Sequence, residues 1–159
     1  MKRIYTFGHE QVERNITVGD IIQNKKNNKK MTQVTAANQE EAEIIAKENI
    51  DMIITGSDWY EDVRKGAPNT FITAALFAGR FITNEEILRG AFDVMMAGAD
   101  SVLTPRSFDV VEMLAKEGMQ VQGHVGMVPS MANKYGGIRT VCKTADEAIT
   151  ILKDMKRLE

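Results

Sequence analysis

Short apolar segments alternate with helix-forming segments along most of this chain, and the alternation strongly restricts the fold. The apolar segments have the length and the β-branched and aromatic content of buried strands. Strands that begin about 20 to 30 residues apart, with helices between them, pair in parallel. The predicted strands are Met31–Ala36, Asp51–Thr55, Thr70–Leu76, Asp100–Thr104 and Met119–Gln122.

Helix-capping residues precede most of the predicted helices. A Thr or Asn followed three residues later by Glu has the spacing of a capping box, in which each residue bonds the backbone of the other. The pairs with this spacing are Asn38 and Glu41, Thr83 and Glu86, and Thr144 and Glu147. Thr17 and Ser107 are predicted to cap two further helices.

Two segments lack a clear pattern of their own. Trp59–Asn69 is charged and too short for a full helix after its turns, so it is predicted to be a connection. Met1–Asn15 has no apolar periodicity, and we expect residues 1–15 to form an arm over the domain. A chain of 159 residues is otherwise one ordinary domain, predicted here to span residues 1–159.

The number of predicted strands leaves more than one fold open. A closed (β/α)₈ barrel has eight strands and roughly 250 residues, whereas this chain has 159 residues. The α/β pattern therefore predicts a parallel βα repeat of about five strands, as a fragment of a TIM-type barrel or a partial barrel completed by a partner. The alternative is a flavodoxin-like, doubly wound sheet. Because a partial barrel leaves sheet edges unpaired, we expect a homo-oligomer.

Charge and composition exclude several classes of partner. The net charge is −2 with 26% charged residues, so no strong electrostatic partner is implied. The basic run Lys25, Lys26, Lys29 and Lys30 lacks interleaved aromatic residues and is interpreted as a solvated helix end, with no nucleic acid expected.

The N-terminus and the cysteine content suggest a cytoplasmic protein without a membrane partner. Met1–Phe7 lacks the apolar core of a signal peptide, and no apolar run approaches the roughly 20 residues that cross a bilayer. Cys142 is the only cysteine, so no intrachain disulfide can form and a reducing compartment fits. We expect this thiol to be packed and not catalytic.

A glycine-rich motif follows the last predicted strand. It reads Gly123-His-Val-Gly-Met-Val-Pro129, with His124 where strand becomes loop. Glycines such as Gly123 and Gly126 allow positive φ or a close approach of backbone to a ligand. Since α/β proteins bind ligands at the C-terminal ends of their strands, the sequence predicts a ligand site beside His124.

This motif, with Gly136-Gly137 and the segments Arg64–Asn69, Ala97–Asp100 and Thr144–Ala148, resembles ketopantoate hydroxymethyltransferase. The resemblance runs from about Ile16 to the C-terminus. It implies a barrel of the phosphoenolpyruvate-mutase and isocitrate-lyase type, in the first committed step of pantothenate synthesis. The implied reaction is metal-assisted enolisation of a small 2-oxo acid, 2-oxoisovalerate, and hydroxymethyl transfer from the co-substrate methylenetetrahydrofolate.

The resemblance also implies a Mg²⁺ site. In the family a metal-binding aspartate follows the second strand in a Gly-Asp-Ser motif, and this chain has Gly56-Ser57-Asp58. Magnesium favours carboxylate oxygens, so Asp58 is the predicted metal ligand and Ser57 a predicted substrate contact. The family's second aspartate falls within Ala74-Ala75-Leu76-Phe77, where alanine replaces it.

Further family positions also differ in this chain. The lysine and glutamate that follow the fourth strand align with Leu103 and Pro105, and the family's general base lies on a later strand, beyond Glu159. Thr104 and Arg106 remain as predicted substrate contacts, because an arginine can hold a carboxylate bidentately. The alternative for Arg106 is a solvated side chain.

His124 is the predicted catalytic residue, and its alternative role is structural. An imidazole can bind an anion or transfer a proton near neutral pH, or it can tie the loop to a carbonyl. Gly123, Gly126 and Ser130 are predicted to contact the substrate at the same rim. Three interpretations are open: an enzyme with the family's activity, a catalytically degenerate binding or assembly module, and a small flavodoxin-like binding domain.

Overall fold

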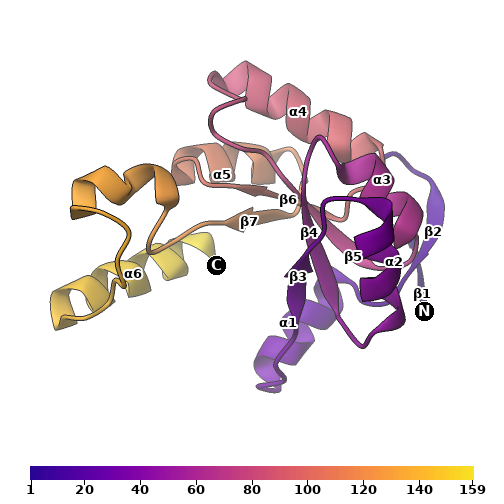
Figure 1. Cartoon of the computed structure of the whole chain (residues 1–159), viewed down its shortest axis with the longest axis horizontal. Helices are drawn as coiled ribbons and strands as arrows, with labels where there is room; N and C mark the ends of the chain where they lie inside the picture. The colour runs from indigo at the N-terminus through magenta and orange to yellow at the C-terminus, as the bar shows by residue number, and fades with distance from the viewer.

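The computed structural model describes residues 1–159, and its centre is a five-stranded parallel sheet (Figure 1). The prediction of five parallel strands is confirmed, and no strand end differs by more than two residues from the one expected. The strands are β3 (Gln33–Thr35), β4 (Met52–Gly56), β5 (Phe71–Ala75), β6 (Ser101–Thr104) and β7 (Val121–Gly123).

The order of the strands identifies the sheet as part of a barrel. Neighbours in the sheet follow one another in the chain, in the order β3-β4-β5-β6-β7. Right-handed crossovers between such strands place the connecting helices on one face, and Figure 1 shows α4 and α5 on the same side of the sheet. A doubly wound sheet instead reverses its order at a switch point. The partial (β/α) barrel is therefore confirmed, and the flavodoxin-like alternative does not describe this sheet.

The sheet is curved enough for its two edge strands to touch through side chains. Gln33 of β3 and Gln122 of β7 exchange amide hydrogen bonds of 3.4 and 3.3 Å. Thr73 and Ser101 share a 2.7 Å hydrogen bond on the same, concave face. No backbone ladder joins β3 to β7, so the half-barrel stays open between these edges.

Six α-helices and one 3₁₀ helix connect the strands. They are α1 (Val18–Lys26), α2 (Gln39–Lys47), α3 (Tyr60–Gly66), α4 (Asn84–Met96), α5 (Phe108–Lys116), η1 (Pro129–Tyr135) and α6 (Ala145–Leu158).

The predicted caps mostly form as expected. Thr17, Asn38, Thr83 and Thr144 each accept a bond from the backbone N–H three residues on. Ser107 precedes α5 as predicted, but its side chain makes no capping bond.

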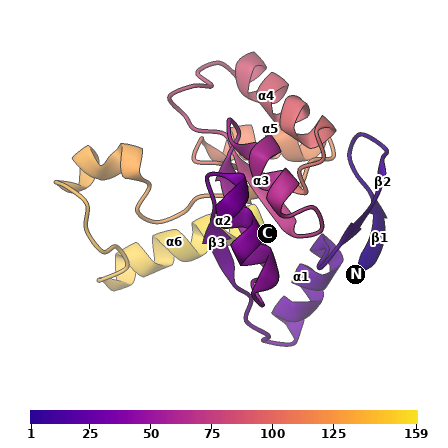
Figure 2. The same ribbon diagram turned by 45° about the vertical axis from the view of Figure 1, so that its right-hand side comes forward.

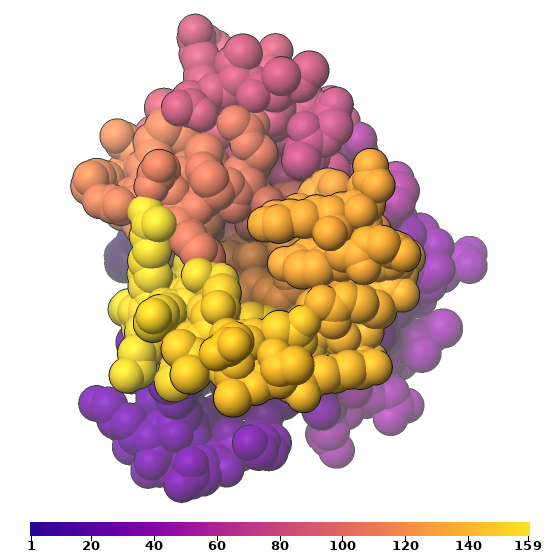
Figure 3. Space-filling model, turned by 90° about the vertical axis from the view of Figure 1, so that its left-hand side faces the viewer, coloured from indigo at the N-terminus to yellow at the C-terminus, as the bar shows by residue number.

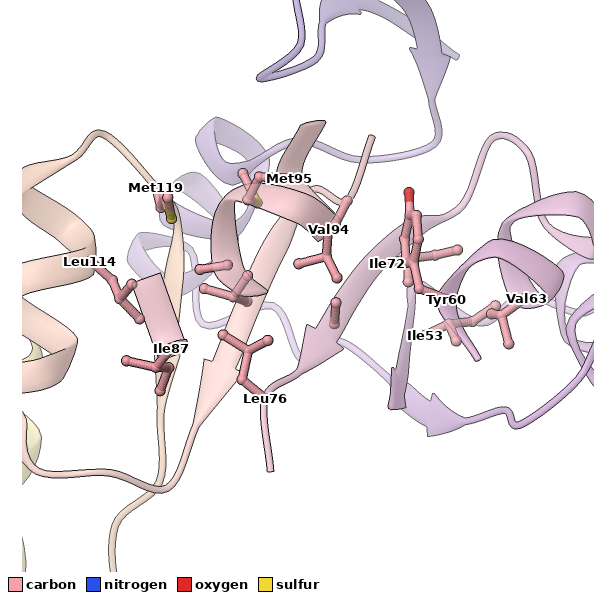
Figure 4. Close-up of a cluster of buried hydrophobic side chains, with 14 of the residues drawn as sticks. Ile53, Tyr60, Val63, Ile72, Leu76, Ile87, Val94, Met95, Leu114 and Met119 are labelled. Carbon is pink, nitrogen blue, oxygen red and sulfur yellow. The ribbon is translucent and has the colours of Figure 1, made fainter. Parts of the chain in front are cut away.

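The hydrophobic core lies between the convex face of the sheet and its helices. Figure 4 shows Ile53 of β4 beside Val63 of α3 and Ile72 of β5 beside Tyr60 of α3, and all four are fully buried. Alternation along a strand sends these side chains outward, so the intervening residues face the concave side.

The N-terminal segment, expected to form an arm, folds as a β-hairpin that the sequence analysis did not predict. β1 (Lys2–Tyr5) and β2 (Gln11–Arg14) pair antiparallel, and His9 in their turn has φ +63°. Figure 2 shows the hairpin standing apart from the main sheet. Its anchor is Arg14, a buried residue that hydrogen-bonds Asp100 and the carbonyl of Gly98.

The predictions for the segment after β4 and for Cys142 were wrong, because burial depends on contacts with distant parts of the chain. The segment expected to be a connection contains α3, whose Tyr60 and Val63 are buried. Cys142, expected to be packed, is exposed.

The C-terminal part stands out from the rest of the molecule because no strand lies beyond β7. Figure 3 shows α6 and the segment after β7 framing a hollow on this side. None of the helices is both long and apolar enough to cross a membrane.

Candidate functional site

A pocket of about 500 Å³ opens at the carboxyl end of the parallel sheet. Residues near the ends of four strands contribute to its wall, among them Ile54, Gly56, Ala75 and Leu103. The loops that follow β4, β5, β6 and β7 complete it. Ligand sites of α/β proteins lie at this edge, because the loops there vary without disturbing the sheet.

The glycine-rich motif brings its predicted residues to this pocket. His124 directly follows β7, is half-buried and lines the pocket. Its imidazole has no hydrogen-bond partner within the protein, so the ring does not tie the loop to a carbonyl. Gly126 turns the chain with φ +84°, and Pro129 begins η1, which places Ser130 on the same wall.

The two glycines of the motif, Gly123 and Gly126, lie close to other side chains and do not line the pocket. A Cβ on Gly123 would lie 2.6 Å from Cδ2 of Leu158. Gly123 therefore allows α6 to approach β7 closely. A Cβ on Gly126 would lie 3.5 Å from Cγ2 of Val141, and the positive φ there already favours glycine.

Asp58 and Ser57 lie outside the residues that line the pocket. Asp58 is exposed, and its carboxylate forms an ion pair with the guanidinium of Arg80. The pocket lining holds no carboxylate, and no group of three or more His, Cys, Asp or Glu side chains is placed to hold a metal ion. The residues present therefore do not fit the Mg²⁺ site that the resemblance implies.

Arg106 and Thr104 also lie outside the residues that line the pocket. Thr104 is fully buried and accepts a 3.2 Å hydrogen bond from the backbone N–H of Arg106. The guanidinium of Arg106 donates to the carbonyls of Phe81 and Ile82 at 2.6 and 2.9 Å. Nη1 of Arg106 is thus engaged by backbone carbonyls, and Arg106 is not part of the pocket lining. It holds the loop after β5, which lines the pocket through Phe77, Ala78 and Gly79.

The pocket wall is apolar where the family pattern is charged. Ala75, Leu103 and Pro105 all line the pocket. They occupy the positions that the resemblance assigns to an aspartate, a lysine and a glutamate. His124 is the one titratable side chain on the lining, with the hydroxyl-bearing residues Thr35, Thr55 and Ser130 around it.

Two aromatic residues at the pocket were missed by the sequence analysis. Trp59 follows β4 and Phe77 follows β5, and both line the pocket while remaining about half exposed. Their position in the sequence could have identified them, since each lies within three residues of the carboxyl end of a strand. Large apolar side chains in such loops are candidates for ligand contact.

Two other landmarks of the resemblance, Arg64–Asn69 and Ala97–Asp100, meet at the opposite end of the sheet. Arg64 Nη2 donates to Asp100 Oδ2 at 2.8 Å, and its Nη1 donates to the carbonyls of Pro68 and Thr70 at 3.2 and 2.8 Å. Arg64 Nε also donates to the hydroxyl of Tyr60 at 3.0 Å. Burial raises the pKa of that phenol, so it stays neutral. These residues hold α3 against the sheet and lie at the end of the sheet opposite the pocket.

Comparison with known proteins points to one family. The profile of the family described as ketopantoate hydroxymethyltransferase matches residues 57–159. A 3-methyl-2-oxobutanoate hydroxymethyltransferase of Ignicoccus hospitalis is 28% identical over 92% of this chain and 65% of its own length. The enzyme of the same name from Kosmotoga olearia is 30% identical over 86% of this chain and 60% of its own length.

This chain therefore spans less than two thirds of the length of these two relatives. Among solved structures, the carboxyl transferase domain of Rhizobium etli pyruvate carboxylase covers 64% of this chain and 24% of its own at 15% identity, with a TM-score of 0.47. That likeness is too weak to define a fold or a function. The family profile covers well over half of the 159 residues, and the chain belongs to the ketopantoate hydroxymethyltransferase family.

Proposed function

We propose that the pocket binds a small 2-oxo acid and that the chain takes part in hydroxymethyltransferase chemistry of the pantothenate pathway. In that chemistry a proton leaves the carbon beside the ketone, the methylene carbon of methylenetetrahydrofolate bonds to that carbon, and water supplies the hydroxyl as tetrahydrofolate leaves. One observation carries the proposal. The family's glycine–histidine motif puts His124 and Ser130 on a pocket at the carboxyl end of the sheet.

The lining suits a branched 2-oxo acid in shape and polarity. Ile54, Leu103 and Val128 offer apolar surface to an aliphatic branch. Ser130 and His124 offer hydrogen bonds to the polar end of the ligand. A pocket that is mostly apolar with a few polar groups is typical of small-molecule sites.

His124 is the group assigned to proton transfer. A base that removes a carbon-bound proton needs access to the substrate and a free nitrogen. The ring lines the pocket and no protein group occupies its nitrogens. No step is assigned to Mg²⁺, since Asp58 is paired with Arg80 and no carboxylate lines the pocket.

A second candidate function is binding without the family's turnover. It is favoured by Ala75, Leu103 and Pro105, which make the pocket wall apolar at the positions of the family's charged groups. Electrostatic stabilisation of an enolate accounts for several kcal/mol in metal-assisted reactions. A pocket without those charges would hold a ligand but enolise it far more slowly.

The association state and the location are part of the proposal. Exposed Ile149, Leu152 and Met155 give α6 an unpartnered apolar stripe, and this supports a homo-oligomer. A cytoplasmic location stays a prediction from the sequence.

The test is proton–deuterium exchange at C3 of 2-oxoisovalerate, followed by NMR in D₂O with and without Mg²⁺. This measures enolisation without requiring the folate. We expect exchange with the parent chain and its loss in His124→Ala. The matched control is His9→Asn, which changes the only other histidine and keeps a residue that tolerates the positive φ there.

The outcomes separate the two functions. Exchange that is lost only in His124→Ala supports the enzymatic proposal and the role of that ring. Absence of exchange from the folded parent chain, together with saturable binding of 2-oxoisovalerate, overturns it in favour of the binding function. Exchange that persists in His124→Ala removes His124 from the mechanism.

A further inference from the structure

Two large aromatic side chains remain about half exposed at the rim of the pocket. Trp59 is 47% exposed and Phe77 is 52% exposed, and both belong to the pocket lining. Exposing rings of this size sacrifices burial that would otherwise stabilise the fold. Neither ring is used by the proposed proton transfer, so their placement points to a contact outside the protein.

The two rings converge on one glycine. A Cβ on Gly56 would lie 3.1 Å from Cε2 of Phe77 and 3.2 Å from Cε3 of Trp59. Both rings therefore lie against the backbone at the end of β4, although they come from different loops. A side chain at position 56 would push at least one ring away, so the glycine maintains their spacing.

The loops that carry the rings are tied to each other, and the loop after β5 is also tied to neighbouring side chains. Arg106 holds the carbonyls of Phe81 and Ile82, and the carboxylate of Glu86 accepts the N–H of Ile82. The Asp58–Arg80 ion pair joins the loop after β4 to the loop after β5 beside the rings. A rim that is fixed in this way presents its aromatic surface at a low entropic cost on binding.

We propose that Trp59 and Phe77 bind the planar heteroaromatic ring of a ligand by stacking at the mouth of the pocket. Aromatic side chains bind such rings through their faces, largely irrespective of substituents. The inference rests on the proposed function, in which methylenetetrahydrofolate supplies a pterin ring of this class. It assigns the two residues to the donor and leaves the inner pocket with His124 to the 2-oxo acid.

The experiment uses Trp59 as its own reporter. It is the only tryptophan of the chain, so the ¹⁵N-labelled protein has a single indole N–H resonance. The probes are 6-methylpterin, p-aminobenzoylglutamate and 2-oxoisovalerate, titrated separately. We expect 6-methylpterin to shift the indole resonance saturably, and p-aminobenzoylglutamate, which lacks the pterin, to bind more weakly.

Variants of the second ring test the pairing. Phe77→Leu keeps apolar bulk but removes the aromatic face, and it should weaken 6-methylpterin binding by about 10-fold. Phe77→Tyr keeps the aromatic face and should bind 6-methylpterin as the parent does. This result would show that the loss in Phe77→Leu comes from lost stacking and not from misfolding. Tyr5→Leu is the matched control, because Tyr5 is an exposed aromatic residue on the N-terminal hairpin.

The result that overturns the proposal is an indole resonance that stays in place at saturating 6-methylpterin. Equal affinity of Phe77→Leu and the parent also overturns it. Failure of the proposed reaction is distinguishable, since it appears as absent exchange in 2-oxoisovalerate while 6-methylpterin still binds. Conversely, exchange that depends on His124 without any pterin binding leaves the reaction in place and removes this site.

Discussion

Arg14 donates from Nε to Oδ1 of Asp100 at 2.6 Å, although the two residues are 86 positions apart in the chain. Both side chains are almost fully buried, with 3% and 5% of their surface exposed. Arg64 binds the other carboxylate oxygen, Oδ2, which also accepts the N–H of Ile72. One carboxylate thus joins the N-terminal hairpin, α3 and the sheet.

Removing this carboxylate should be strongly destabilising. Asp100→Asn keeps the shape but leaves Arg14 and Arg64 without their counter-charge in a buried site. We expect a loss of about 3–5 kcal/mol in the free energy of unfolding, measured by urea denaturation. The control is Asp62→Asn, whose partner Lys65 is exposed and whose removal should cost at most about 1 kcal/mol. Similar losses in both variants would contradict the assignment.

Gly66 should resist substitution because α2 and α3 approach each other there. A Cβ at this position would collide with the carbonyl oxygen of Gln39 and lie 2.9 Å from Cβ of Ala42. Alanine favours a helix by up to about 1 kcal/mol, yet we expect Gly66→Ala to lose about 1–3 kcal/mol through the clash.

The matched control for Gly66 is Gly79→Ala. No atom lies within 4 Å of a Cβ at Gly79, so its effect on the free energy of unfolding should stay within about 0.5 kcal/mol. Urea denaturation of the two variants side by side checks the difference. If Gly66→Ala proves as stable as the parent, the two helices can separate without penalty.

The loop between β5 and α4, which carries Phe77, should loosen at low pH. The backbone N–H groups of Thr83 and Ile82 bond the carboxylate of Glu86 and lower its pKa below the ordinary value of 4.5. A carboxyl group with a lower pKa in the folded state stabilises the protein above pH 4.5, and this contribution disappears as the pH falls through the folded pKa. We expect the unfolding temperature to drop below pH 4.5.

The variant Glu86→Gln isolates this contribution. It should be less stable than the parent at pH 7, and it should show a smaller drop in unfolding temperature on acidification. Differential scanning calorimetry at several pH values measures both effects. An unchanged pH profile would mean that other carboxylates, such as Glu147 beside Arg139, dominate the acid sensitivity.

Mg²⁺ should leave the parent chain unchanged. Asp58 is committed to Arg80 and the pocket lining lacks carboxylates, so the folded state offers no favourable site for the ion. We expect equal unfolding temperatures with and without millimolar Mg²⁺, in both the parent and Asp58→Asn. A rise in the parent that Asp58→Asn abolishes would instead identify Asp58 as a metal ligand.

The exposed stripe of α6 should control self-association. Leu152 lies at the centre of this stripe, with Ile149 and Met155 one turn away on each side, and each is about half exposed. Leu152→Lys places a charge in the stripe, and sedimentation velocity should show a shift toward monomer. The exposed change Lys153→Glu is the control, and an equal shift in that variant would exclude the stripe as the interface.

Local sequence signals predicted the repeated part of the fold well. Thr17, Asn38, Thr83 and Thr144 cap helices because their short side chains reach nearby N–H groups, and this chemistry is local. The strands were found because apolar residues cluster where helices cover the sheet. The hairpin was missed because its apolar face is small, with Ile4 opposite Val12, and because Arg14 anchors it through a partner far along the chain.

The candidate site was only partly predictable for a similar reason. His124 belongs to the glycine-rich motif and Ser130 directly follows it, so their proximity follows from the sequence. The ion pair of Asp58 with Arg80 and the contacts of Arg106 with Phe81 depend on how separate loops meet. No single segment contains that information.

The contact between Gln33 and Gln122 has a mechanical consequence. The edges of the half-barrel meet through two long amide hydrogen bonds and no backbone ladder. Each such bond contributes only about 1 kcal/mol net, and glutamine side chains extend and fold through several rotatable bonds. The distance between β3 and β7 can therefore increase to admit a bulky ligand without breaking any strand pairing.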